Sequence, residues 1–194
     1  MRSSVFSEGF AQANLVTSGA IIVDAGAAIT LQNGGAFTAF AGRSISVAAG
    51  SSITAQSGLI DLETFASLRG SSFSTADDVL TDTSFDIRID GTLSTKGRWV
   101  NDFGVIDVLA RGGSAYLDGG SISLSVASRI QEASGDPNVA IDRSGSILLN
   151  ASAVIDVSGG GYIDPDGNFD LTSRGGNLAL TNSTVYFGLG EAAA

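Results

Sequence analysis

Short runs of alternating apolar and small polar residues recur along the chain, each introduced by one or two glycines and closed by a polar turn. The clearest repeats occupy residues 42–47, 50–53, 58–62, 119–124, 145–149 and 175–180. Alternation with a period of two predicts a β-strand with one apolar and one polar face. Because so short a strand cannot bury its apolar face alone, it must stack on other copies of the repeat. The pattern therefore predicts an all-β fold, a right-handed parallel β-helix (β-solenoid).

The spacing of the repeats predicts how the chain is organised. Between residues 18 and 65 the apolar runs are separated by turn sequences such as Asn-Gly-Gly at 33–35. Hairpins would use the same turns, but the even spacing favours three strands per coil of roughly 20 or more residues. No helix of ordinary length is predicted. Loop excursions are expected at the irregular segments, residues 96–103, 128–144 and 161–174.

We expect residues 1–194 to form one continuous β-helix segment without separable domains. Neither end of the sequence reads as a cap, and an open coil leaves strand edges and apolar core exposed. The segment is therefore expected to be excised from a longer protein and to be capable of end-to-end self-association. Within it, Ile122, Ile147 and Leu178 lead the clearest repeats and are predicted to lie in the core.

Composition limits the classes of partner. The chain of 194 residues is 43% hydrophobic but only 15% charged, and its net charge is −10 with Lys96 as the single lysine. Binding to nucleic acid or to an anionic membrane surface needs clustered Lys and Arg, so we expect neither. No run approaches the ~20 apolar residues of a membrane-spanning helix. The absence of cysteine and histidine excludes disulfides and thiolate or imidazole metal sites.

Two stretches resemble segments of the filamentous haemagglutinin family, large exoproteins of Gram-negative bacteria. They are Gly-Arg-Trp-Val-Asn-Asp at 97–102 and Ala-Val-Ile-Asp-Val-Ser-Gly-Gly-Gly-Tyr-Ile at 153–163, framed by the repeats at 119–124 and 175–180. The resemblance covers most of residues 90–187. It implies a β-helical shaft that leaves the cell by two-partner secretion through an outer-membrane transporter. It also implies a secreted or cell-surface location and adhesion to a host-cell or other surface receptor or glycan. The family brings no catalytic residues, and we expect no enzyme.

Residues 164–170 are the best candidate for metal chemistry. Asp164, Asp166, Asn168 and Asp170 place oxygens at alternate positions, as at the start of a calcium loop. The glycine expected at the sixth position is replaced by Phe169, and no glutamate stands near the twelfth. The alternative is an acidic turn between coils, and titration with calcium distinguishes the two interpretations.

Surface carboxylates leave open a polysaccharide-binding or -cleaving β-helix as the alternative function. The candidates are Asp77, Asp78, Asp82, Asp86 and Asp90. Alternation puts Asp86, Arg88 and Asp90 on one face of a strand, opposite Ile87 and Ile89. Charge pairing on a solvated face explains that arrangement equally well. A filament- or surface-layer-forming subunit is a further alternative.

Aromatic residues in the irregular segments are candidates for ligand contact, because aromatic rings stack on sugars or pack over gaps between coils. We take Arg98, Trp99 and Tyr162 as the candidate contact residues. The remaining aromatic candidates are Phe103, Tyr116 and Tyr186. The phenylalanines predicted to stack inside the coils are Phe37, Phe40, Phe65, Phe73 and Phe85. Asn150 and Asn182 begin Asn-x-Ser/Thr triplets and are candidates for glycosylation.

Overall fold

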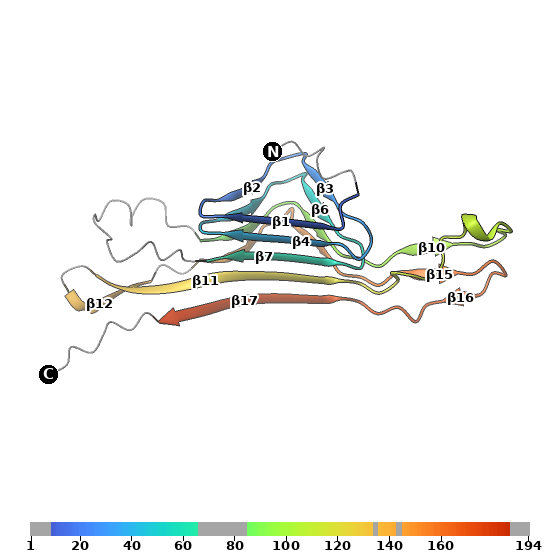
Figure 1. Cartoon of the computed structure of the whole chain (residues 1–194). Coiled ribbons are helices and arrows are strands. Elements are labelled where there is room, and N and C mark those ends of the chain that lie inside the picture. Colours follow the sequence, from blue (N-terminus) through green and yellow to red (C-terminus); the bar gives the residue numbers. More distant parts are fainter. Residues whose placement is uncertain (1–8, 66–84, 134–135, 143–144, 187–194) are drawn as a thin grey trace.

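The computed structural model describes residues 9–65, 85–133, 136–142 and 145–186. This part of the chain is all-β, as the sequence predicts, and its one helical element is a single 3-10 turn, η2 (Val108–Ala110). A search of the described residues for a helix long and apolar enough to cross a membrane finds none. Figure 1 shows a body of stacked strands from which a narrower extension projects to one side.

The body consists of three sheets with parallel strands. The first contains β1 (Gln12–Thr17), β4 (Ala36–Ala41), β7 (Leu59–Thr64), β11 (Ser121–Ala133) and β17 (Asn177–Tyr186), and β12 (Asp136–Asp142) adds antiparallel to β11. The second contains β2 (Ile21–Val23), β5 (Ile45–Val47), β8 (Ile87–Ile89) and β13 (Ile147–Leu149). The third contains β3 (Ala28–Thr30), β6 (Ser52–Thr54), β9 (Thr92–Ser94) and β14 (Val154–Asp156).

Successive strands of the body enter the three sheets in rotation. After one strand in each sheet, the chain returns to the first sheet beside the strand it placed there before, so β4 pairs with β1 and β7 with β4. We call one such passage a circuit. Gln12 lies beside Ala36, and Ala36 beside Leu59, which matches the predicted repeat of roughly 20 or more residues.

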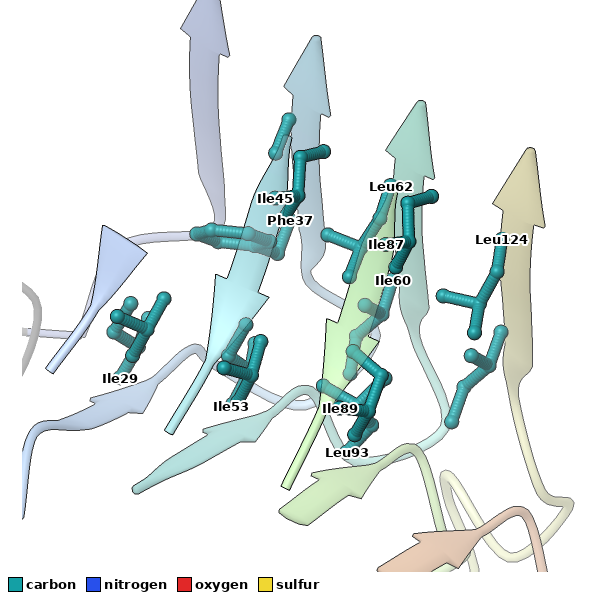
Figure 2. Close-up of a cluster of buried hydrophobic side chains, with 14 of the residues drawn as sticks. Ile29, Phe37, Ile45, Ile53, Ile60, Leu62, Ile87, Ile89, Leu93 and Leu124 are labelled. Atoms are coloured by element: carbon teal, nitrogen blue, oxygen red, sulfur yellow. The ribbon is translucent and has the colours of Figure 1, made fainter. Parts of the chain in front are cut away.

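The core lies between the three sheets and is filled by alternate residues of each strand. In β4 the side chains of Phe37, Ala39 and Ala41 are buried, whereas Ala36, Thr38 and Phe40 face outward and are half-buried. Equivalent inward positions stack from circuit to circuit, so that Phe37 lies beside Ile60 and Ile60 beside Ile122. Figure 2 shows these stacks as continuous columns of aliphatic side chains with one phenylalanine.

The prediction that the phenylalanines stack inside the coils is confirmed for Phe37 and wrong for Phe40. Phe40 occupies an outward position of β4, because inward and outward residues alternate strictly along a strand. Phe65 and Phe85 are half-buried, and residues 66–84 between them lie outside the described residues. Phe73 lies outside the described residues.

The last strand of each sheet leaves its inward side chains partly uncovered. Of the three predicted core residues, Ile122 is buried at 1% exposure, Ile147 is half-buried and Leu178 is 44% exposed. Leu178 has the same inward position as Ile122, but in the described part of the chain no circuit follows β17. The prediction of a buried Leu178 is therefore wrong, because its burial requires a neighbour on both sides.

A column of glycines leads into the first sheet. Gly35, Gly58, Gly120 and Gly176 each stand one residue before a strand of that sheet, and a Cβ atom on Gly58, Gly120 or Gly176 would overlap the carbonyl oxygen of the glycine in the circuit before. Backbone hydrogen bonds link the same corner, from the N–H of Ser121 to the carbonyl of Gly58 at 2.8 Å. The recurrent glycine of the sequence is therefore required by the close approach of stacked backbones.

Two buried hydroxyl groups at the end of β9 accept and donate no hydrogen bond within the described residues: Ser94 Oγ and Thr95 Oγ1. Thr95 is 0% exposed, so its hydroxyl is desolvated without compensation. We expect Thr95→Val to raise the free energy of unfolding by about 1 kcal/mol, because it replaces that hydroxyl by a methyl group. Urea denaturation measures the change. The exposed Thr30→Val is the control and is expected to have little effect, and a less stable Thr95→Val would contradict the prediction.

Candidate functional site

The extension of Figure 1 is a small sheet that we call the arm, made by residues 97–117 and 159–174. Its strands are β10 (Trp99–Asn101), β15 (Gly161–Ile163) and β16 (Phe169–Asp170). The central strand β15 pairs in parallel with β10 and antiparallel with β16. Both segments are inserted where the chain passes from the third sheet back to the first, in consecutive circuits. Stacking of the circuits therefore brings the two insertions side by side.

The arm places the three predicted ligand contacts on different faces. Trp99 pairs with Gly161 and Val100 pairs with Tyr162, so alternation puts Trp99 on one face of the sheet and Tyr162 on the other. Arg98 lies on the Tyr162 side, because a Cβ on Gly112 would come within 3.5 Å of Arg98 Nη2 and 2.6 Å of Val100 Cγ1. One ligand on one face of the arm cannot touch all three residues.

Trp99 forms an open aromatic platform. Its indole lies over Gly161, where a Cβ atom would be 2.8 Å from Cζ3 and Cη2 and 3.2 Å from the Leu171 side chain. Gly161 thus allows the ring to lie flat on the sheet, and 66% of Trp99 is still exposed. An exposed ring of this kind is suited to stacking on a sugar or to packing against a protein surface.

Other large apolar side chains of the arm are also exposed. They are Phe103, Ile106, Val108, Leu109, Phe169 and Leu171, with Leu109 exposed at 95% and Ile106 at 91%. A concentration of exposed apolar residues on a single projection marks a surface for interaction. Sequence reasoning missed Ile106 and Leu109, although the four apolar residues around Asp107 at 105–109, which lack strand alternation, were a usable signal.

Tyr162 has a structural role in the arm through Asp102. The carboxylate of Asp102 is 3% exposed and accepts hydrogen bonds from the backbone N–H groups of Gly112 and Gly113, both at 2.9 Å, and from the Tyr162 hydroxyl. The bonds from Gly113 and then Gly112 lower the pKa of Asp102, whereas burial and the bond to Asp102 raise the pKa of Tyr162. The pair closes the loop 103–113 onto the sheet.

Acidification is expected to loosen this loop. The pKa of Asp102 is lowered from its ordinary value of 3.8, so its stabilising effect is complete above that value and is lost as the pH falls through the lower folded-state pKa. Protection of the Gly112 and Gly113 amides from hydrogen exchange, after correction for intrinsic rates, should be constant at neutral pH and decrease below 3.8. In Asp102→Asn the protection should be weaker and independent of pH. Equal acid sensitivity in that variant would contradict the assignment.

The predicted calcium loop forms an acidic turn. Asp164 Oδ1 accepts the N–H groups of Asp166 at 2.9 Å and Asn168 at 2.8 Å, and its Oδ2 accepts from Asn168 Nδ2 at 2.7 Å. Asp170 Oδ1 accepts from the Thr172 backbone and hydroxyl. These bonds lower the pKa values of Asp164 and Asp170. Among the described residues no three acidic side chains gather as a metal site would require, and calcium binding stays a prediction for titration.

The two carboxylates that flank β8 join neighbouring circuits. Asp86 Oδ1 accepts the N–H of Ser146 at 2.8 Å, and Asp90 Oδ1 accepts from Asn150 Nδ2 at 2.6 Å. Arg88 is exposed between them, and β8 buries Ile87 and Ile89 as predicted. The two aspartates thus hold the next circuit in register. The other carboxylate candidates, Asp77, Asp78 and Asp82, lie outside the described residues.

The remaining predicted contacts add little to this surface. Residues 128–144 contain the pairing of β11 with β12, but their side chains lie outside the described residues, as does that of Tyr186. Asn182 is exposed, whereas the amide of Asn150 is bonded to Asp90. The candidate surface is therefore the arm.

Comparison with protein-family models, curated proteins and solved structures finds no match to the chain.

Proposed function

We propose that the circuits form a right-handed parallel β-helix, and that this β-helix is the adhesive shaft segment of a secreted exoprotein of the filamentous haemagglutinin type. The observation that carries the proposal is the rotation of the chain through three parallel sheets with each circuit in register on the last. Such stacking produces a long object with a repetitive outer surface, and each added circuit contacts only its neighbours. A shaft that extends a surface away from a cell needs this property.

The arm supports the resemblance on which the adhesive role rests. The stretches at 97–102 and 153–163 lie far apart in the sequence, yet β10 and β15 within them pair directly, Trp99 beside Gly161. The parts of the two motifs that form β10 and β15 therefore belong to one structural unit. This unit also carries the exposed aromatic and aliphatic side chains that an adhesive contact requires.

Four of the described carboxylates do not favour a sugar-cleaving function. Asp86 and Asp90 accept hydrogen bonds from the following circuit, and Asp102 and Asp164 accept them from the backbone of their own loops. Each is held in a structural interaction. We therefore propose contact through the arm and no catalysis.

Attachment of protein-coated beads to cultured cells tests the proposal. Trp99→Ala and Leu109→Ala on the arm are expected to reduce attachment severalfold, because each removes an exposed apolar contact. Ile22→Ala is the matched control, since Ile22 is 65% exposed on β2 of the body. All three variants should melt near the temperature of the parent. Failure of the parent to attach, or equal attachment by the arm variants, would refute the adhesive role of the arm.

A further inference from the structure

A cavity of about 420 Å³ opens where the arm joins the body. Its walls come from three consecutive circuits at the corner between the third and first sheets. The side chains used below are Ser57, Tyr116, Asp118, Asp170, Thr172 and Ser173. The volume lies within the range of about 300–1,000 Å³ found for small-molecule sites. The cavity is separate from the Trp99 platform.

Two residues of the cavity wall have strained backbones. Ser57 (φ 54°) and Tyr116 (φ 63°) are the two non-glycine residues with left-handed φ in the described part of the chain. They contact each other, since Ser57 Oγ lies 2.6 Å from the carbonyl oxygen of Tyr116 and 2.7 Å from that of Asp118, and its single hydrogen is donated to this pair of acceptors. Strained non-glycine residues concentrate at functional sites, where the surrounding structure holds them in place.

The left-handed conformation of Tyr116, a lining residue of the cavity, places its ring against the first circuit. The ring lies against Gly34, where a Cβ atom would be 2.7 Å from Tyr116 Cε1. Gly34 is itself left-handed, with φ +74°. Any other residue at position 34 would displace the ring, so the corner of the first circuit is shaped to accept it.

The lining residues of the cavity include four with hydroxyl groups on serine or threonine, two aspartates and Tyr116, and no lysine or arginine. Asp118 Oδ1 accepts the N–H of Arg174 at 2.7 Å, and Asp170 Oδ1 accepts from Thr172. The second oxygen of each carboxylate accepts no hydrogen bond from the described residues. Such oxygens accept the hydroxyl groups of a ligand, the ring stacks on an apolar ligand face, and an anionic ligand would be repelled.

We propose that this cavity binds a neutral saccharide of one or two rings. Sugar hydroxyls donate to the free oxygens of Asp118 and Asp170, and the C–H face of a sugar ring lies on Tyr116. The proposal deepens the adhesive function and rests on it, because it names the chemical class that a surface receptor would present.

Isothermal titration with the neutral disaccharides maltose, cellobiose and lactose tests the site. At least one is expected to bind, and both Asp118→Asn and Tyr116→Asn should weaken its binding about tenfold, as loss of one charged hydrogen bond or one stacking contact does. Asparagine tolerates a left-handed backbone, so Tyr116→Asn removes the ring and keeps the fold, which its melting temperature checks. Asp166→Asn, on an exposed turn of the arm, is the control and should bind like the parent.

Three results would overturn the inference. The first is no binding of any of the three sugars at high millimolar concentration, and the second is unchanged affinity for the sugar in both variants. The third is heat released on titration with calcium alone that is absent in Asp118→Asn. The failure of the inference is distinguishable from that of the proposed function. Beads that attach through the arm while no sugar binds would refute the cavity only. A sugar that binds while Trp99→Ala and Leu109→Ala beads attach like the parent would refute the role of the arm only.

Discussion

Ile122→Asp is expected to remove a large part of the free energy of unfolding at 25 °C. Ile122 is 1% exposed in the middle of the first sheet, between Ile60 of the preceding circuit and Leu178 of the next. A carboxylate there has no partner among these aliphatic neighbours, and burying it destabilises the fold by more than about 4 kcal/mol. Since domains are stable by about 5–15 kcal/mol, this is a large share of the total. Circular dichroism during urea denaturation measures the loss.

Leu178→Asp is the matched control, because Leu178 occupies the same column one circuit later. Its side chain is 44% exposed, so a carboxylate at this position keeps much of its hydration. The variant is expected to lose no more than about 1 kcal/mol. Equal destabilisation of Ile122→Asp and Leu178→Asp would contradict the assignment of Ile122 to a covered circuit and Leu178 to an uncovered one.

Gly120→Ala is expected to have the second largest effect, a loss of about 3 kcal/mol or more. The added methyl group would overlap the carbonyl oxygen of Gly58 in the circuit below, and backbone atoms cannot rotate away as a side chain does. The N–H of Ser121 bonds that same carbonyl, so displacement also weakens the ladder between β7 and β11. Thermal unfolding followed by circular dichroism gives the change in melting temperature.

Gly175 supplies the control for Gly120→Ala. It precedes Gly176, which is the equivalent of Gly120 in the next circuit. A Cβ on Gly175 would have the carbonyl oxygen of Val157 as its nearest contact, at 3.8 Å, and the backbone of Gly175 is not left-handed. Gly175→Ala should therefore be neutral, or slightly stabilising because alanine restricts the unfolded chain. Comparable losses at Gly120 and Gly175 would show that glycine serves flexibility in these turns instead of close packing.

Sequence reasoning predicted the all-β body and its parallel strands because the sequence signals for strands are local. Alternation within a strand decides which side chains face inward, as at Ile87 and Ile89 on either side of Arg88. It failed where burial depends on neighbours far along the chain. Leu178 has the pattern of a core residue, and it is exposed because no circuit covers β17 in the described part of the chain. The strict glycine requirement at Gly120 likewise comes from a residue in another circuit.

The candidate site was less predictable than the body. Both halves of the arm were identified as irregular segments, but their pairing follows from stacking of the circuits and has no periodic signal in the sequence. Tyr162 was expected to touch a ligand, whereas its hydroxyl bonds Asp102, a contact across two strands of the arm. The left-handed backbones of Ser57 and Tyr116 are imposed by their surroundings, because neither residue type favours that conformation.

Disulfide trapping tests the central claim, the stacking of circuits in parallel register, most directly. The chain contains no cysteine, so an introduced pair reports without interference. Asp61 and Ser123 are outward neighbours on β7 and β11, and two residues so far apart in sequence meet only if the long third circuit returns in this register. The account predicts that Asp61→Cys with Ser123→Cys oxidises readily in the folded protein, and that Asp61→Cys with Ser125→Cys, one outward position away, does not. Equal or faster oxidation of the second pair would contradict it.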